Sequence, residues 1–218
     1  LAKSVQVYGT ALATIVLMLP AYVLASLIVN GRGLGYISSA AGRLRGRWML
    51  LCSVVALVIA AVSTGVSLLL PGEGDEAGAG AVAPEENPAF WGALLVVLVV
   101  VPLQATAEEY VFRGYLMQAI GRWLRHPVFA IVLPVPLFVL GHLYDPLGQV
   151  AVGVFALAAG WLTWRTGGLE AAIALHVVNN LVAFLLSLAG LSDVNDTSPG
   201  WSSLVFSFVL IGVYVAAV

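Results

Sequence analysis

Three charged side chains lie inside one of the most apolar stretches of the chain. Glu108 and Glu109 end a run of mainly Leu, Val and Ala residues that starts at Leu95, and Arg113 follows one helical turn later. A charged group at membrane depth costs at least about 2.5 kcal/mol, so such groups normally face a protein interior. Three of them within one and a half turns predict a polar site buried in a bilayer.

The composition also indicates a membrane protein. Hydrophobic residues make up 61% of the 218 residues and charged residues only 9%, whereas a soluble domain carries about 25% charged residues. In a bilayer the surface can be apolar as well as the core. The net charge of -2 argues against nucleic acid as a partner. The single cysteine, Cys52, cannot form a disulfide within the chain.

The apolar runs predict an all-α, polytopic helix bundle with about seven transmembrane helices and a buried polar cavity. We expect one domain over residues 1–218, with its motifs between residues 89 and 189. The chain begins with Leu1 and is still apolar at Val218, so we expect it to be a piece of a longer protein. Runs long enough to cross about 30 Å of hydrocarbon lie near 5–30, 48–70, 89–121, 128–143, 147–164, 169–189 and 201–218.

The charges outside the spans sort by side once the spans alternate in direction. One face of the predicted bundle then carries nearly all the arginines outside the spans. Arginines on the cytoplasmic side are the usual pattern in membrane proteins, so we expect the arginine face to lie in the cytoplasm. The use of Arg in preference to Lys and the bias toward Ala, Gly and Val suit a protein of a bacterial cytoplasmic membrane. The basic face carries Arg32, Arg43, Arg45, Arg47, Arg122, Arg125 and Arg165; the other face carries Lys3, Glu73, Asp75, Glu76, Glu85, Glu86, Asp145, Asp193 and Asp196.

The polar residues inside the spans form three pairs with a spacing of four. Glu109 and Arg113 share one helix face and can pair within the helix, which lowers the cost of burying both charges. Glu108 is turned away by about 100° and is left freer to act as a general base. A buried ion pair that only locks helices together also explains Glu109 and Arg113, but it explains Glu108 poorly.

The second and third pairs contain histidines. Phe138 precedes His142 by four residues, so its ring can pack against the imidazole, although a plain core or lipid-facing role suits Phe138 alone. Tyr144, Asp145 and Pro146 are expected to end this helix. His176 and Asn180 offer donors for a developing oxyanion or a water, while Asn179 points elsewhere. Interhelical hydrogen bonding is the structural alternative for these residues.

The depths of these residues are similar. Counting about 1.5 Å per residue from the basic boundaries at Arg122, Pro127 and Gly168 places Glu108, His142, His176 and Asn180 about 12–22 Å into the membrane. One shared site is therefore geometrically possible.

In this order on successive spans, the motifs Glu108-Glu109-x-x-x-Arg113, Phe138-x-x-x-His142 and His176-x-x-x-Asn180 resemble the CPBP intramembrane proteases. This is the CAAX-protease and bacteriocin-processing family, also called Abi, which includes the type II CAAX prenyl endopeptidases. Each motif alone is weak, but together in a membrane setting they are specific. The resemblance covers residues 108–180, and no motif position departs from it.

The resemblance implies an intramembrane peptidase. By its pattern Glu108 would activate a water with help from His142, His176 and Asn180 would stabilise the oxyanion, and Glu109 with Arg113 would hold the helix. We favour a mechanism without a cofactor. Zinc is the alternative, because Glu108, His142 and His176 are plausible ligands of Zn²⁺, although no HExxH motif is present.

Two other functions are open at this stage. A non-catalytic immunity or scaffold protein would keep the same fold and motifs, and a transporter or proton pathway would also use intramembrane Glu, His and Arg. Intact motifs favour catalysis over a scaffold, and the lack of inverted repeats disfavours transport. The expected partners are a peptide or membrane-protein substrate and the lipid bilayer.

Overall fold

The computed structural model describes residues 12–30, 35–69, 89–192 and 200–218. Within these ranges the chain is helical, and the only β-type pairing is an isolated bridge between Ser39 and Gly168. The predicted all-α class is therefore confirmed. The helices are α2 (Met18–Asn30), α3 (Gly35–Ser38), α4 (Gly46–Leu69), α5 (Phe90–Glu109), the π-helix η3 (Tyr110–Leu116), α6 (Met117–Trp123), α7 (Pro127–Val132), α8 (Val135–Leu140), α9 (Pro146–Thr166), α10 (Glu170–Leu188) and α11 (Trp201–Ala217).

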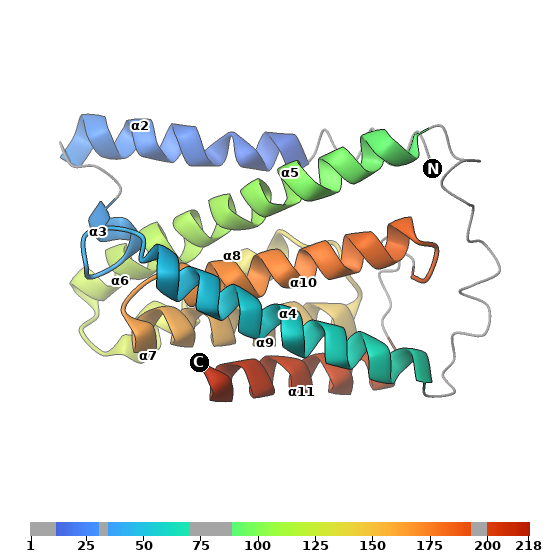
Figure 1. Ribbon diagram of the computed structural model, residues 1–218. Helices are drawn as coiled ribbons and strands as arrows, with labels where there is room; N and C mark the ends of the chain where they lie inside the picture. Colours follow the sequence, from blue (N-terminus) through green and yellow to red (C-terminus); the bar gives the residue numbers. More distant parts are fainter. Residues whose placement is uncertain (1–11, 31–34, 70–88, 193–199) are drawn as a thin grey trace.

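Helix α10 lies in the middle of the bundle. It packs against α4, α5 and α9, while α11 packs on α4 and α9, and α2 lies along the outer side of α5 (Figure 1). The first two turns of α10 are buried on every side and are rich in alanine, with Ala171, Ala172 and Ala174. Small side chains let helix backbones approach closely in membranes, so α10 can contact three neighbours at once.

Four helical segments are long and apolar enough to cross a membrane: Gly46–Val66, Phe90–Trp123, Pro146–Thr166 and Glu170–Leu188. The other predicted spans coincide with shorter apolar helices, namely Leu12–Ile28, Pro127–Leu140 and Ser203–Ala217. At 1.5 Å per residue these three fall short of the hydrocarbon thickness of about 30 Å. The count of about seven spans therefore stays a prediction.

The predicted run 128–143 is not one continuous helix. It forms α7 and α8, with a turn at Leu133 and Pro134 between them. A proline lacks the backbone N–H of a helical hydrogen bond and its ring clashes with the preceding turn. Pro134 therefore fits the start of a new helix better than the interior of an old one.

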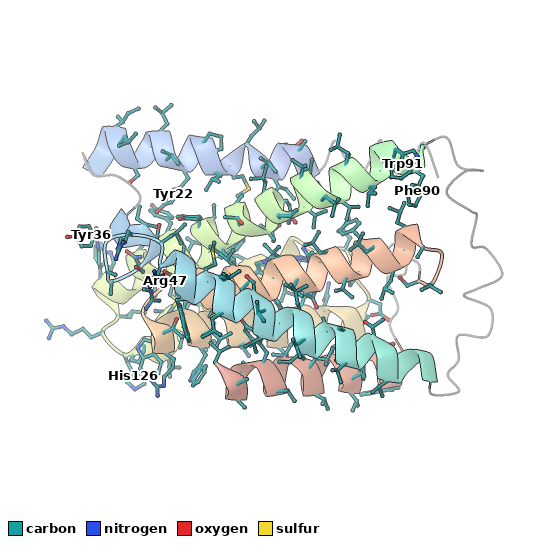
Figure 2. All side chains as sticks on the ribbon, in the orientation of Figure 1. Tyr22, Tyr36, Arg47, Phe90, Trp91 and His126 are labelled. Atoms are coloured by element: carbon teal, nitrogen blue, oxygen red, sulfur yellow. The ribbon has the colours of Figure 1, made fainter. Side chains whose placement is uncertain are left out.

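The helix ends that carry the arginines meet at one end of the bundle. Figure 2 shows Tyr36, Arg47 and His126 at this end, and Phe90 and Trp91 at the opposite one. Backbone bonds from Ala40 N to the Gly167 carbonyl and from Leu169 N to the Ser38 carbonyl join the α3 region to the α9–α10 turn. Arg32, Lys3 and the predicted acidic residues other than Asp145 lie outside the described residues.

A partly buried ion pair between Arg45 and Glu170 fixes this end. Glu170 is fully buried, and its carboxylate accepts hydrogen bonds from the backbone N, Nε and Nη2 of Arg45 at 2.7–3.0 Å. Arg45 Nη1 also donates to the Thr166 carbonyl at 3.0 Å. Hydrogen bonding to Glu170 raises the pKa of Arg45. The start of α10 is thereby tied to the start of α4, which holds the helix that carries His176 and Asn180.

Candidate active site

Glu109 forms the buried centre of the site. It is fully buried, and its Oε1 accepts a hydrogen bond from Arg113 Nη1 at 2.8 Å. The predicted pair within the helix is therefore confirmed. The Arg113 guanidinium also donates to the Ala156 carbonyl at 3.3 Å and lies 4.4 Å from the ring centroid of Phe138. Phe138 is a core residue whose ring faces a cation, an attraction that is stronger away from water.

The backbone changes its winding at this point. α5 ends at Glu109, and the next seven residues, Tyr110–Leu116, continue as a π-helix that contains Arg113. π-Helical turns are rare and occur often at functional sites. Neither the hydropathy nor the spacing of the motifs predicted this π-helix.

Glu108 keeps one carboxylate oxygen without a hydrogen bond. The residue is 8% exposed, and its Oε1 accepts from Gln104 Nε2 at 2.6 Å. Its Oε2 has no hydrogen-bond partner in the protein and lies 3.7 Å from His176 Nε2. Glu109 takes the arginine, as the helix phase predicted, and its own Oε2 also lacks a hydrogen bond. Glu108 is the carboxylate that makes no ion pair with Arg113 and that keeps some exposure.

His176 lies between the two glutamates. Its Nδ1 is 2.7 Å from Glu109 Oε1, and its Nε2 faces Glu108. Because the Glu109 carboxylate can only accept when it is ionised, Nδ1 carries the hydrogen and Nε2 of a neutral ring has a lone pair. In that tautomer Nε2 accepts hydrogen bonds, and it can donate to an oxyanion only after the ring is protonated. The sequence did not predict the contact between His176 and Glu109.

His142 lies just beyond α8 rather than within a membrane helix. α8 ends at Leu140, with Gly141 as its C-cap, so the predicted helical position of His142 is wrong. The four-residue spacing still brings its ring to 4.9 Å from the Phe138 ring, and Nδ1 bonds to the Phe138 carbonyl at 2.8 Å. A carbonyl oxygen only accepts, so Nδ1 donates and Nε2 of the neutral ring carries a lone pair.

A cavity of about 350 Å³ connects the second and third motifs. His142, His176 and Asn180 line it, together with Phe138, Phe155 and residues of α9 and α11. Asn180 is half-buried, and Asn179 is exposed, which agrees with the predicted difference in orientation. The two asparagines are nevertheless linked, because Asn179 Nδ2 donates to Asn180 Oδ1 at 3.4 Å, and Asn179 lines the same cavity.

Gln104 belongs to the site, although the sequence reasoning missed it. It is 4% exposed, donates to Glu108 and accepts from Asn180 Nδ2 through its Oε1 at 3.4 Å. The available signal was its position four residues before Glu108, the same spacing that marked the other pairs. Gln104 thus joins the helix of the first motif to the helix of the third.

The zinc alternative requires three ligands that converge on one point. Among the described residues no group of three or more His, Cys, Asp and Glu side chains is placed to hold a metal ion. Glu108 and His176 approach each other, but a catalytic zinc site generally uses three protein ligands. We derive no catalytic step through a metal ion, and zinc stays the alternative cofactor.

Comparison with known proteins gives an independent view of the same region. Residues 89–182 match the family model described as "Type II CAAX prenyl endopeptidase Rce1-like", and this segment holds all six predicted site residues. A curated relative, the "Uncharacterized protein YyaK" of Bacillus subtilis (strain 168), is 36% identical over 95 residues.

The match covers 40% of this chain and 32% of that relative, so the aligned segment spans about a third of the relative's length. No solved structure matches the chain significantly. The resemblance found from the three motifs is confirmed: residues 89–182 of this membrane protein are similar to the Rce1-like type II CAAX prenyl endopeptidases, a family of proteases.

Proposed function

We propose that the protein is an intramembrane endopeptidase, which hydrolyses a peptide bond of a membrane-associated protein or peptide with a water activated by Glu108. The observation that carries this proposal is the Oε2 of Glu108, which has no hydrogen-bond partner in the protein and lies 3.7 Å from Nε2 of His176, a residue that lines the cavity. A buried carboxylate oxygen without a partner is costly unless a water or substrate group satisfies it.

The distance between these two atoms suits a shared water. At 3.7 Å they are too far apart for a direct hydrogen bond, whose usual length is about 2.7–3.2 Å. A water that bridges them at about 2.8 Å from each atom would lie to one side of the line that joins them. Glu108 would take a proton from this water, and the remaining hydroxide oxygen would attack the carbonyl carbon of the substrate.

The remaining residues would stabilise charge and return the proton. Asn180 gives one N–H to Gln104, so its second N–H is available to the oxyanion of the tetrahedral intermediate. His142 lines the same cavity and would help to hold the water. The proton on Glu108 would finally pass to the leaving amine as the C–N bond breaks. Glu109 and Arg113 would keep the imidazole of His176 in place.

This function implies a location and a partner. The substrate would reach the cavity from the bilayer or its surface, and the arginine-rich end of the bundle would face the cytoplasm of a bacterium. Of the alternatives, a non-catalytic scaffold has no need of an unpartnered carboxylate oxygen next to a histidine.

The proposal is tested with the purified protein in liposomes and a library of transmembrane and lipidated peptides. Reaction in H₂¹⁸O followed by mass spectrometry should show new C-termini that carry ¹⁸O, because hydrolysis adds one solvent oxygen to the released carboxylate. A mock preparation from cells without the expression plasmid is the control for host proteases. Equal product patterns from the protein and the mock preparation would reject the peptidase function.

A further inference from the structure

We infer that Gln104 is a positioning residue of the active site, which sets the orientation of the reactive groups on Glu108 and Asn180. The inference rests on the proposed peptidase function and deepens it. Gln104 does not itself line the cavity and lies outside the three predicted motifs, yet it contacts one residue of the first motif and one of the third.

The hydrogen bonds around Gln104 have one consistent direction. An ionised Glu108 can only accept, so Gln104 must turn its amide nitrogen toward Glu108 Oε1 at 2.6 Å. Its carbonyl oxygen then faces Asn180, which must present its own amide nitrogen at 3.4 Å. The Asn180 carbonyl in turn accepts from Asn179. A donor chain therefore runs from the exposed Asn179 through Asn180 and Gln104 to the buried Glu108.

The direction of these hydrogen bonds decides which atoms of Glu108 and Asn180 are available to the water and the substrate. On Glu108 the bond from Gln104 occupies Oε1 and leaves Oε2 for the water. On Asn180 it selects the amide nitrogen rather than the carbonyl for the side toward Glu108. An oxyanion requires N–H donors, and a flipped Asn180 would present a repelling carbonyl oxygen instead. Gln104 thus couples the base to the oxyanion donor across two helices, α5 and α10.

Other residue types do not supply this pattern at position 104. A methionine has similar length but neither donates nor accepts well. A glutamate keeps the shape but replaces the donor by a carboxylate next to Glu108. An asparagine keeps the amide but is one methylene shorter, so it cannot span both partners. Glutamine is the uncharged side chain that can donate to Glu108 and accept from Asn180 over this span.

The test is a double-mutant cycle on the full-length chain in liposomes. Gln104→Met should lower kcat about 10–100-fold, which corresponds to the loss of one hydrogen bond to a charged group, while KM stays close to wild type and the melting temperature falls by only a few degrees, the cost of one buried hydrogen bond. The double variant Gln104→Met with Asn180→Ala should be little slower than the slower single variant, because coupled residues are not additive. Thr106→Val on the same helix is the matched control, since the Thr106 hydroxyl bonds only to the Pro102 carbonyl of its own helix.

A structural role alone gives a different result. Gln104→Met would then lower the melting temperature and the folded fraction, with an unchanged kcat per folded molecule and full additivity with Asn180→Ala. An unchanged kcat per folded molecule, or full additivity with Asn180→Ala, would overturn the inference while leaving the peptidase function in place.

A second readout does not need activity. In protein labelled with ¹⁵N in its glutamine side chains, the Gln104 amide signal is identified by its loss in Gln104→Met. That signal should shift in Glu108→Leu and in Asn180→Ala but not in Thr106→Val. If no hydrolysis is found but the signal responds in this way, the bridge stands and the peptidase function fails. A signal that ignores both substitutions refutes the bridge itself.

Discussion

Replacing Glu109 by alanine should destabilise the protein strongly as well as inactivate it. Glu109 is fully buried and holds both Arg113 Nη1 and His176 Nδ1 through one oxygen. Without the carboxylate, the Arg113 cation keeps the Ala156 carbonyl, the rings of Phe138 and Phe112, and the more distant charge of Glu108. Arg113 is 4% exposed, so water cannot replace the lost anion without a change in packing.

The size of the effect follows from the unpaired charge. Removing one partner of a buried ion pair costs about 3–5 kcal/mol, and the lost bond to His176 adds to this. At about 2–4 °C per kcal/mol for a chain of this size, the melting temperature should fall on the order of 10 °C. The same reasoning predicts that adding Arg113→Met to Glu109→Ala restores part of the loss, because the double variant no longer buries the Arg113 cation without its anion.

The assay is thermal unfolding in one detergent, followed by circular dichroism and by the soluble fraction after heating. Glu108→Ala is the matched control, since it removes the neighbouring carboxylate on the same helix but leaves Arg113 paired. Its loss should be nearer 1 kcal/mol, the usual net value of one hydrogen bond. If Glu109→Ala and Glu108→Ala melt within 2 °C of each other, the different roles assigned to the two carboxylates are wrong.

Three further outcomes are expected. Asn180→Ala should reduce turnover by about 10²–10³-fold, the usual effect of one oxyanion donor, with the melting temperature nearly unchanged. The control Asn179→Ala should have a smaller effect on turnover. Equal activity of Asn180→Ala and wild type would remove α10 from the oxyanion site. EDTA and phenanthroline should leave turnover unchanged, and inhibition that added Zn²⁺ reverses would favour a zinc mechanism. A cysteine introduced into residues 71–88 should react with an impermeant maleimide from outside intact cells, with the fully buried Cys52 as a silent background; reaction only from the cytoplasmic side contradicts the topology.

Much of the site could be predicted from the sequence because it depends on spacing along single helices. The pairing of Glu109 with Arg113 and the ring contact of Phe138 with His142 are local, at four residues. Helix geometry fixes such neighbours whatever the surrounding fold. The freer state of Glu108 followed from the same geometry.

Contacts between helices were not predictable in this way. The bond between His176 and Glu109 joins residues 67 apart in the chain, and the Asn180–Gln104 contact joins residues 76 apart. Both depend on how α10 packs beside α5, which hydropathy does not specify. The break between α7 and α8 was missed for another reason: hydropathy reports that a segment is apolar, but it does not weigh the proline that begins a new helix.

The most direct test of the central claim is the turnover of Glu108→Gln on a substrate that the wild type cleaves. The amide keeps the size of the side chain but cannot take a proton from water, so single-turnover cleavage should fall by at least about 10²-fold, with the melting temperature close to wild type. Rates are compared per folded molecule. Cleavage at a near wild-type rate by a folded Glu108→Gln protein would contradict the assignment of Glu108 as the base.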